Sequence, residues 1–262
     1  FAEHRLYNPG DSLKHIDWKV FGKTDRMFVK KYEEETNLRC CVAIDISSSM
    51  YFSKSGNSKL QQTGIAAASI LTLLKNQLDA SAIALFDENV KVLTPFKSSA
   101  RHYRNLIVQL QQTINEPTKL SQKTNISTAL HEIAERIHQR SLVVIFSDFS
   151  LEEASEVSLI DALLHLKHNK HEILLFQVID GSLEKDLQFE HRPYELVDME
   201  NGKSIKLHPH EVQSVYQQRV QQRIEAIKDA CLKHKIDYVL YDYTQPISVV
   251  LTEYLQKRSK MM

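Results

Sequence analysis

The sequence predicts an α/β protein with a doubly wound, mostly parallel sheet and helices on both faces, plus an irregular N-terminal segment and a β-hairpin insertion. Two observations predict this class. Short apolar runs typical of covered strands alternate with longer amphipathic segments typical of helices. The 262 residues, 42% of them apolar and 25% charged, suffice for one large core with an accessory segment.

The predicted strands are short apolar runs with little alternation, as expected where helices cover both faces of a parallel sheet. They are residues 37–46, 81–86, 141–149, 172–179 and 237–241, with residues 90–93 pairing beside the second of them. Cys40 and Cys41 are adjacent in the first strand, so their side chains should enter the core on opposite faces.

The predicted helices carry apolar residues at helical spacing, such as Leu71 and Leu74 in the first of them. They are residues 58–79, 100–114, 125–140, 154–167, 209–235 and 246–258. Asn201-Gly202 is a strong turn signal between two short strand patterns, and it predicts a hairpin excursion at about residues 190–208.

Two parts are expected along the chain: residues 1–36, a polar lead-in, and residues 37–262, the α/β domain on which the lead-in packs. Arg5, Asp11, Asp17 and Trp18 would tie the lead-in to the domain through a buried tryptophan and ion pairs. A partner-binding role for these four residues is the alternative.

Composition and glycine spacing exclude several functions. Lysine plus arginine equals aspartate plus glutamate, 33 each, so a protein that coats nucleic acid or an anionic membrane is not expected. The six glycines do not form a dinucleotide-binding loop, a phosphate-binding loop or a nucleophile elbow.

The cysteines indicate the compartment. Their number is odd and two are adjacent, so a disulfide framework is not expected. A reducing compartment, the cytoplasm, is therefore the expected location. The longest apolar stretch, residues 65–74, is too short to cross a bilayer. Membrane anchoring would have to come from residues upstream of Phe1.

Oxygen-bearing side chains gather at the predicted carboxyl ends of the strands, where ligands of parallel α/β sheets bind. Asp45, Ser47 and Ser49 alternate after the first strand, so an extended turn can point them to one side. Asp148 ends another strand, and Thr124 precedes a helix. Two carboxylates and several hydroxyls are hard ligands that suit Mg²⁺ or Mn²⁺ and leave room for a partner's carboxylate. Helix caps and turns are the simpler interpretation of the same residues.

These five residues, in this chain order, resemble the metal-ion-dependent adhesion site of von Willebrand factor A domains. The resemblance implies that Ser47, Ser49 and Thr124 bind the ion directly or through water, while Asp45 and Asp148 act through water and hydrogen bonds. Lys123 departs from the pattern, because that family often has glycine before the threonine.

The lead-in adds a second resemblance. The motifs His4-Arg5-x-Tyr7-x-Pro9-Gly10-Asp11, Ile16-Asp17-Trp18-Lys19 and Val29-Lys30-x-Tyr32-x-Glu34 are similar to the bacterial domain-of-unknown-function family fifty-eight. That family joins such a segment to an A-like domain. Many members are encoded near MoxR-type AAA+ ATPases, and many carry N-terminal membrane helices.

Three functions are compatible with these observations. The first is a non-enzymatic module whose divalent cation captures a carboxylate of a partner protein, in an assembly or maturation step with a MoxR-type ATPase. The second is a metal-dependent hydrolase of phosphoesters or peptides, for which Asp87 and Glu88 are the candidate bases. The third is a structural domain with a vestigial site.

The remaining histidines and the basic residues of the long helix are expected to have structural rather than functional roles. His165, His168 and His171 span a helix end and a strand start, where a solvated edge is expected. His208 and His210 belong to the entry of a helix. The polar face of that helix is expected to be solvated, and it carries Arg219, Arg223 and Lys228.

Overall fold

A computed structural model describes residues 3–7, 16–31, 38–52, 58–115, 125–138, 140–149, 156–199 and 202–259. It divides the chain into two compact units, residues 1–37 and 38–262. The predicted packing of the lead-in on the domain stays a prediction.

The first unit contains regular structure where the sequence predicted an irregular segment. Strands β1 (Glu3–Leu6) and β2 (Phe28–Lys31) pair antiparallel, and helix α1 (Trp18–Thr24) lies between them in the chain. Asp17 caps α1, because its Oδ1 accepts hydrogen bonds from the backbone N–H groups of Lys19 and Val20. Elements of four to seven residues are too short for periodicity to reveal them.

Trp18 does not fill a core inside this unit. Its side chain is 60% exposed, whereas Ile16 and Val29 are buried. The predicted burial of Trp18 against the α/β domain stays a prediction.

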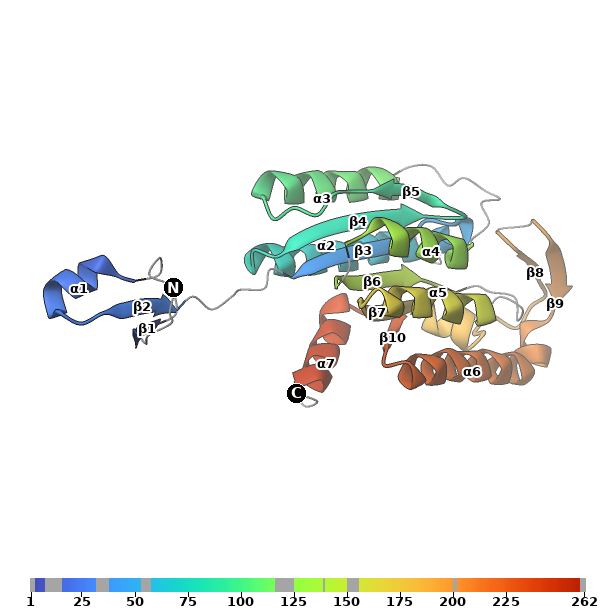
Figure 1. Cartoon of the computed structure of the whole chain (residues 1–262). Helices are drawn as coiled ribbons and strands as arrows, with labels where there is room; N and C mark the ends of the chain where they lie inside the picture. Colours follow the sequence, from blue (N-terminus) through green and yellow to red (C-terminus); the bar gives the residue numbers. More distant parts are fainter. Residues whose placement is uncertain are drawn as a thin grey trace. The chain divides into compact units, whose positions relative to one another are not determined.

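The second unit is built on a six-stranded sheet with the order β10-β7-β6-β3-β4-β5 (Figure 1). All neighbours pair parallel except β5, which runs antiparallel to β4. The strands are β3 (Arg39–Asp45), β4 (Ala80–Phe86), β5 (Val90–Leu93), β6 (Leu142–Ser147), β7 (Glu172–Ile179) and β10 (Asp237–Asp242).

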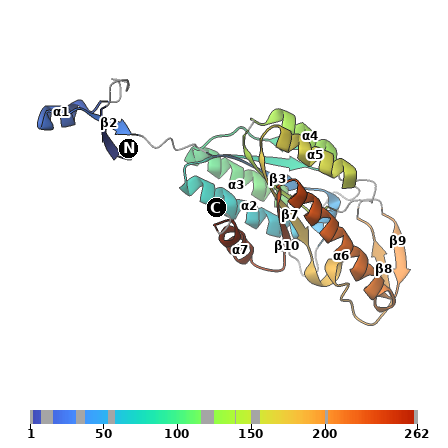
Figure 2. The same cartoon turned by 60° about the horizontal axis from the view of Figure 1, so that its bottom comes forward.

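Helices cover both faces of this sheet (Figure 2). They are α2 (Lys59–Asn76), α3 (Ala100–Asn115), α4 (Ile126–Arg136), α5 (Glu156–His168), α6 (Pro209–Lys233) and α7 (Ile247–Ser259). Helices α2, α3 and α7 contribute to one buried apolar cluster, and α4, α5 and α6 to the other. Cys40 belongs to the first cluster and Cys41 to the second, as their alternation in β3 predicts. The predicted fold class is confirmed.

The sheet reverses its strand order beside β3. From β3 the chain moves through α2 to β4 on one side, and later strands β6, β7 and β10 follow on the other side. The carboxyl ends of β3 and β6 are therefore neighbours at a topological switch point, which is where open α/β sheets bind ligands.

The predicted hairpin is present between β7 and α6. Strands β8 (Tyr194–Val197) and β9 (Ser204–Leu207) pair antiparallel. Gly202 has φ +70, a left-handed conformation that glycine adopts without steric cost. Asn201 lies outside the described residues. Among the described helices, none is both long and apolar enough to cross a bilayer.

Candidate metal centre

The end of β3 places Asp45 inside the protein. Its side chain is fully buried, and Oδ1 accepts a hydrogen bond of 2.9 Å from the backbone N–H of Ser47. Ser47 is extended, and the 3₁₀ turn η2 (Ser48–Tyr51) begins directly after it. This turn brings the hydroxyl oxygens of Ser47 and Ser49 to 3.1 Å from each other.

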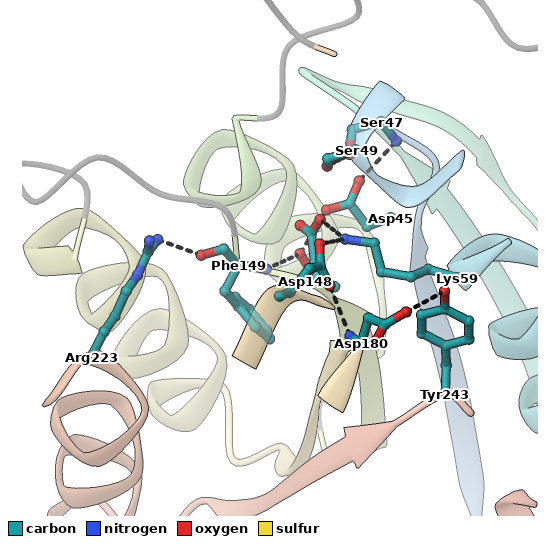
Figure 3. A network of polar contacts seen from close by, with 11 residues as sticks. Asp45, Ser47, Ser49, Lys59, Asp148, Phe149, Asp180, Arg223 and Tyr243 are labelled. Atoms are coloured by element: carbon teal, nitrogen blue, oxygen red, sulfur yellow. Dashed lines mark hydrogen bonds and ion pairs between the residues drawn. The ribbon is translucent and has the colours of Figure 1, made fainter. Parts of the chain in front are cut away.

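The end of β6 meets this turn through a serine. Ser147 Oγ donates a hydrogen bond of 2.6 Å to Asp45 Oδ2 and accepts one of 3.1 Å from the backbone N–H of Phe149. Asp148 lies between these two residues in the sequence, and Figure 3 shows it in the same cluster as Asp45. Four of the five predicted site residues are therefore brought together: Asp45, Ser47, Ser49 and Asp148.

The fifth residue, Thr124, lies outside the described residues, as does Lys123. The next residue, Asn125, is described as the N-cap of α4, and its Oδ1 accepts from the backbone N–H of Thr128. The role of Thr124 stays a prediction.

Phe149 holds the loop after β6 in an uncommon backbone conformation. Its φ is +48, a left-handed value that costs a non-glycine residue roughly 1–2 kcal/mol. The Arg223 guanidinium on α6 donates a 2.6 Å hydrogen bond to the Phe149 carbonyl, and the Phe149 side chain is buried. Arg223 is therefore not merely a solvated residue, because it helps to fix the loop that carries Asp148.

A buried lysine that the sequence did not reveal completes the cluster. Lys59 is the first residue of α2, and its side chain is 1% exposed. Its Nζ lies 2.7 Å from Asp148 Oδ2 and 2.7 Å from Glu184 Oε1 (Figure 3 shows the lysine reaching Asp148). The side chains of Asp148 and Glu184 are 7% and 30% exposed, so Asp148 depends more on Lys59.

Glu184 is positioned by the π-helical turn η4 (Gly181–Lys185), which follows β7. Its Oε2 accepts a 2.8 Å hydrogen bond from the backbone N–H of Asp180, the N-cap of this turn. Asp180 Oδ1 accepts from Ser182 and from the backbone of Leu183, and Oδ2 accepts from the Tyr243 hydroxyl at 3.0 Å. The carboxyl ends of β7 and β10 thus support the lysine's second carboxylate.

Burial and neighbouring charge shift the ionisation of these groups. Burial, followed by the charge of Asp148, raises the pKa of Asp45 from 3.8 to about 7, against hydrogen bonds from Ser147 and Ser47. Burial by itself lowers the pKa of Lys59, but Asp148 and Glu184 raise it above its ordinary value. Burial also raises the pKa of Glu184, and the Lys59 charge offsets only part of that effect. Lys59 is charged, because its ammonium contacts both carboxylates at 2.7 Å.

The family model "Protein of unknown function DUF58" matches residues 3–226. The chain belongs to the DUF58 family.

Curated relatives of this DUF58 chain are uncharacterised. Rv1480 of Mycobacterium tuberculosis (strain ATCC 25618 / H37Rv) and Mb1516 of Mycobacterium bovis are each 24% identical over 181 residues. The match covers 68% of this chain and 54% of each relative. The chain therefore spans about half the length of these proteins.

Solved structures share the fold at low identity. BatB, a conserved hypothetical protein of Bacteroides thetaiotaomicron, has a TM-score of 0.52 and 16% identity over 85% of this chain and 99% of its own. An aerotolerance-related membrane protein of Bacteroides fragilis has a TM-score of 0.52 and 15% identity, covering 84% and 99%. The pilus adhesin SpaC of Lactobacillus rhamnosus GG has a TM-score of 0.50 and 10% identity, covering 88% and 31%.

The donor set in this DUF58 chain fits a hard divalent cation. Adjacent ligands of an octahedral ion at 2.0–2.1 Å stand about 3 Å apart, and the two serine hydroxyls are separated by 3.1 Å. Within the described ranges, no group of three or more His, Cys, Asp or Glu side chains is arranged to hold a metal ion. An ion at this position would therefore depend on hydroxyl oxygens as well as carboxylates.

The histidines have structural surroundings. His171 is 2% exposed and its Nδ1 accepts from the backbone N–H of Ser141, so the predicted solvated edge is wrong for this residue. Burial lowers the pKa of His171. His131 and His165 join α4 to α5 with their Nδ1 atoms 2.9 Å apart.

Proposed function

We propose that this chain is a non-enzymatic protein-binding module that captures a carboxylate of a partner protein through a divalent cation. Ser47, Ser49 and Thr124 would bind the cation directly or through water, and Asp45 and Asp148 would act through water and hydrogen bonds. Mg²⁺ or Mn²⁺ suits these oxygen atoms. Once bound, the ion would supply a Lewis-acidic position for the partner's carboxylate.

The observation that carries this proposal is the meeting of two loops at one switch point. The hydrogen bond from Ser147 Oγ to Asp45 Oδ2 joins residues 102 positions apart in the sequence. It holds the Asp45 carboxylate while Ser47 and Ser49 present adjacent hydroxyl oxygens. Binding residues held by strand ends in this way lose little conformational entropy when a ligand arrives.

The partner and the location belong to the same proposal. The resemblance of the lead-in suggests an assembly or maturation step with a MoxR-type AAA+ ATPase. Cys40, Cys41 and Cys231 are free and buried, which supports a reducing, cytoplasmic location for this unit.

A metal-dependent hydrolase is the second candidate, and one observation favours it. The pKa of Asp45 is raised to about 7, near the value that suits a general base at neutral pH. Both of its oxygens, however, already accept hydrogen bonds from the chain. The bases predicted from the sequence, Asp87 and Glu88, follow β4, and Asp87 pairs with Lys91 at 3.0 Å. Metal-dependent turnover of phosphoester substrates that Asp148→Ala abolishes would favour this candidate over the binding module.

Recovery of a partner from the native cell tests the binding module. The whole chain serves as bait with Mn²⁺ or with a chelator, beside the Ser47→Ala/Ser49→Ala double variant. We expect the partner to be recovered by the wild type with Mn²⁺ and lost with the chelator or the double variant. Ser69→Ala is the matched control, because its hydroxyl bonds to a carbonyl of its own helix. Equal recovery in all conditions would contradict a metal-dependent function.

A further inference from the structure

Lys59 occupies a position that ordinarily disfavours a buried cation. It is the first residue of an 18-residue helix whose N-cap, Ser58, forms a capping box with Gln61. The amino end of a helix carries a partial positive charge, so an ammonium there is repelled. Lysine is also almost never fully buried unless it is paired. Asp148 and Glu184 must therefore offset both costs.

Carboxyl groups outnumber the ammonium in this cluster. Asp45, Asp148, Glu184 and Asp180 place four buried or partly buried carboxyl groups there, and Lys59 is the cation that contacts two of them. Uncompensated charge in a buried site is unfavourable. A second cation beside these groups would reduce the remaining imbalance.

The ammonium nevertheless already uses an oxygen of a predicted metal ligand. Its Nζ is 2.7 Å from Asp148 Oδ2, and Asp148 lies beside Asp45 (Figure 3). A divalent cation at the serine hydroxyls would be a like charge close to this ammonium, and the two repel. Glu184 offers the ammonium a second partner at 2.7 Å, and the backbone N–H of Asp180 holds that carboxylate in place.

We propose that Lys59 is an internal cation that competes with the divalent metal for Asp148, and that Glu184 retains the ammonium when the metal binds. The affinity of the site is then set by residues that are not metal ligands. This inference rests on the proposed metal site and adds how the chain regulates it.

Calorimetric titration of the whole chain with Mn²⁺ tests this competition. Lys59→Met removes the competing charge, and we expect Mn²⁺ to bind at least about tenfold more tightly. Glu184→Gln leaves the ammonium with Asp148 alone, and we expect binding to weaken about threefold or more. Lys75→Met is the matched control, because it removes an exposed lysine from the same helix. Circular dichroism checks that each variant is folded. If Lys59→Met does not fold, the Mn²⁺ affinity of Glu184→Gln alone decides whether the competition exists.

The outcomes separate the two proposals. The competition is supported if Lys59→Met binds Mn²⁺ more tightly than the wild type and Glu184→Gln binds it more weakly. It is also supported if Lys59→Met binds Mn²⁺ and the wild type does not. Equal affinities of the wild type and both variants overturn the competition, while loss of binding in Ser47→Ala/Ser49→Ala keeps the metal site. Absence of binding in every protein overturns both.

Discussion

The Lys59 ammonium lies 2.7 Å from the Asp148 carboxylate, although the two residues are 89 positions apart in the sequence. This ion pair joins the start of α2 to the loop after β6. Both side chains are almost fully buried, so the pair is shielded from water and salt. It therefore matters for stability as well as for the candidate site.

Breaking this pair should destabilise the protein. In the presence of a chelator, Lys59→Met leaves Asp148 buried without its cation, and we expect the free energy of unfolding to fall by about 3 kcal/mol. Asp148→Asn should also destabilise, because it leaves Lys59 with Glu184 alone. Urea denaturation measures both, and the double variant should lose clearly less than the sum of the two. Strictly additive losses would show that the ion pair contributes nothing.

The raised pKa of Asp45 predicts how stability depends on pH without metal. Between pH 4 and 7 the unfolded chain has ionised this group, whereas the folded protein keeps it protonated, since its pKa rises from 3.8 to about 7. Its contribution to stability is complete below pH 4 and is lost as the pH rises to 7, by at most about 4 kcal/mol. In the Asp45→Asn variant, this part of the decline in the free energy of unfolding with rising pH should be absent.

Urea denaturation in chelator at several pH values between 5 and 8 measures the effect. Asp161→Asn is the control, because it removes an exposed carboxylate on α5. Parallel pH profiles for the wild type and Asp45→Asn would contradict the assignment.

The sheet and much of the candidate site could be predicted from the sequence. The apolar runs that become β3 and β6 end at Asp45 and Asp148, and parallel pairing brings their carboxyl ends together. The alternation of Asp45, Ser47 and Ser49 indicated a shared direction, which depends only on extended backbone geometry.

Lys59 and Glu184 could not be predicted in the same way. A lysine in the first turn of an amphipathic helix is usually solvated, and its burial here depends on loops that are distant in the sequence. Glu184 lies in a five-residue π-helical turn, which has no periodic signal. Arg223 follows the polar spacing of α6, yet it reaches the Phe149 carbonyl through tertiary packing.

Divalent cations should stabilise the folded chain if they bind at the serine hydroxyls. A ligand at 100 times its dissociation constant adds about 2.7 kcal/mol to the free energy of unfolding. We expect Mn²⁺ to raise the melting temperature of the wild type and to leave the melting temperature of the Ser47→Ala/Ser49→Ala variant unchanged. Differential scanning calorimetry measures both, and Ser69→Ala should respond like the wild type. An equal shift in the double variant would place the ion elsewhere.

The Tyr243 hydroxyl should stabilise the turn that carries Glu184. It donates a hydrogen bond to Asp180 Oδ2. Burial raises the pKa of Asp180, but hydrogen bonds from Leu183, Ser182 and Tyr243 outweigh burial, so the pKa lies below its ordinary value. Tyr243→Phe removes a hydrogen bond to a charged group, and we expect a loss of about 1.5 kcal/mol at neutral pH.

The pH dependence of that loss distinguishes a charged acceptor from a neutral one. A carboxylate with a lowered pKa stabilises the fold above its unfolded pKa, and this contribution disappears as the pH falls through the folded value. The difference between Tyr243→Phe and the wild type should therefore be complete at pH 7 and shrink below about pH 4. Tyr238→Phe is the matched control, because its hydroxyl donates to the neutral amide of Gln177 at 2.6 Å. If urea denaturation shows the same loss at pH 3 and pH 7 for Tyr243→Phe, the hydroxyl does not act through the Asp180 charge.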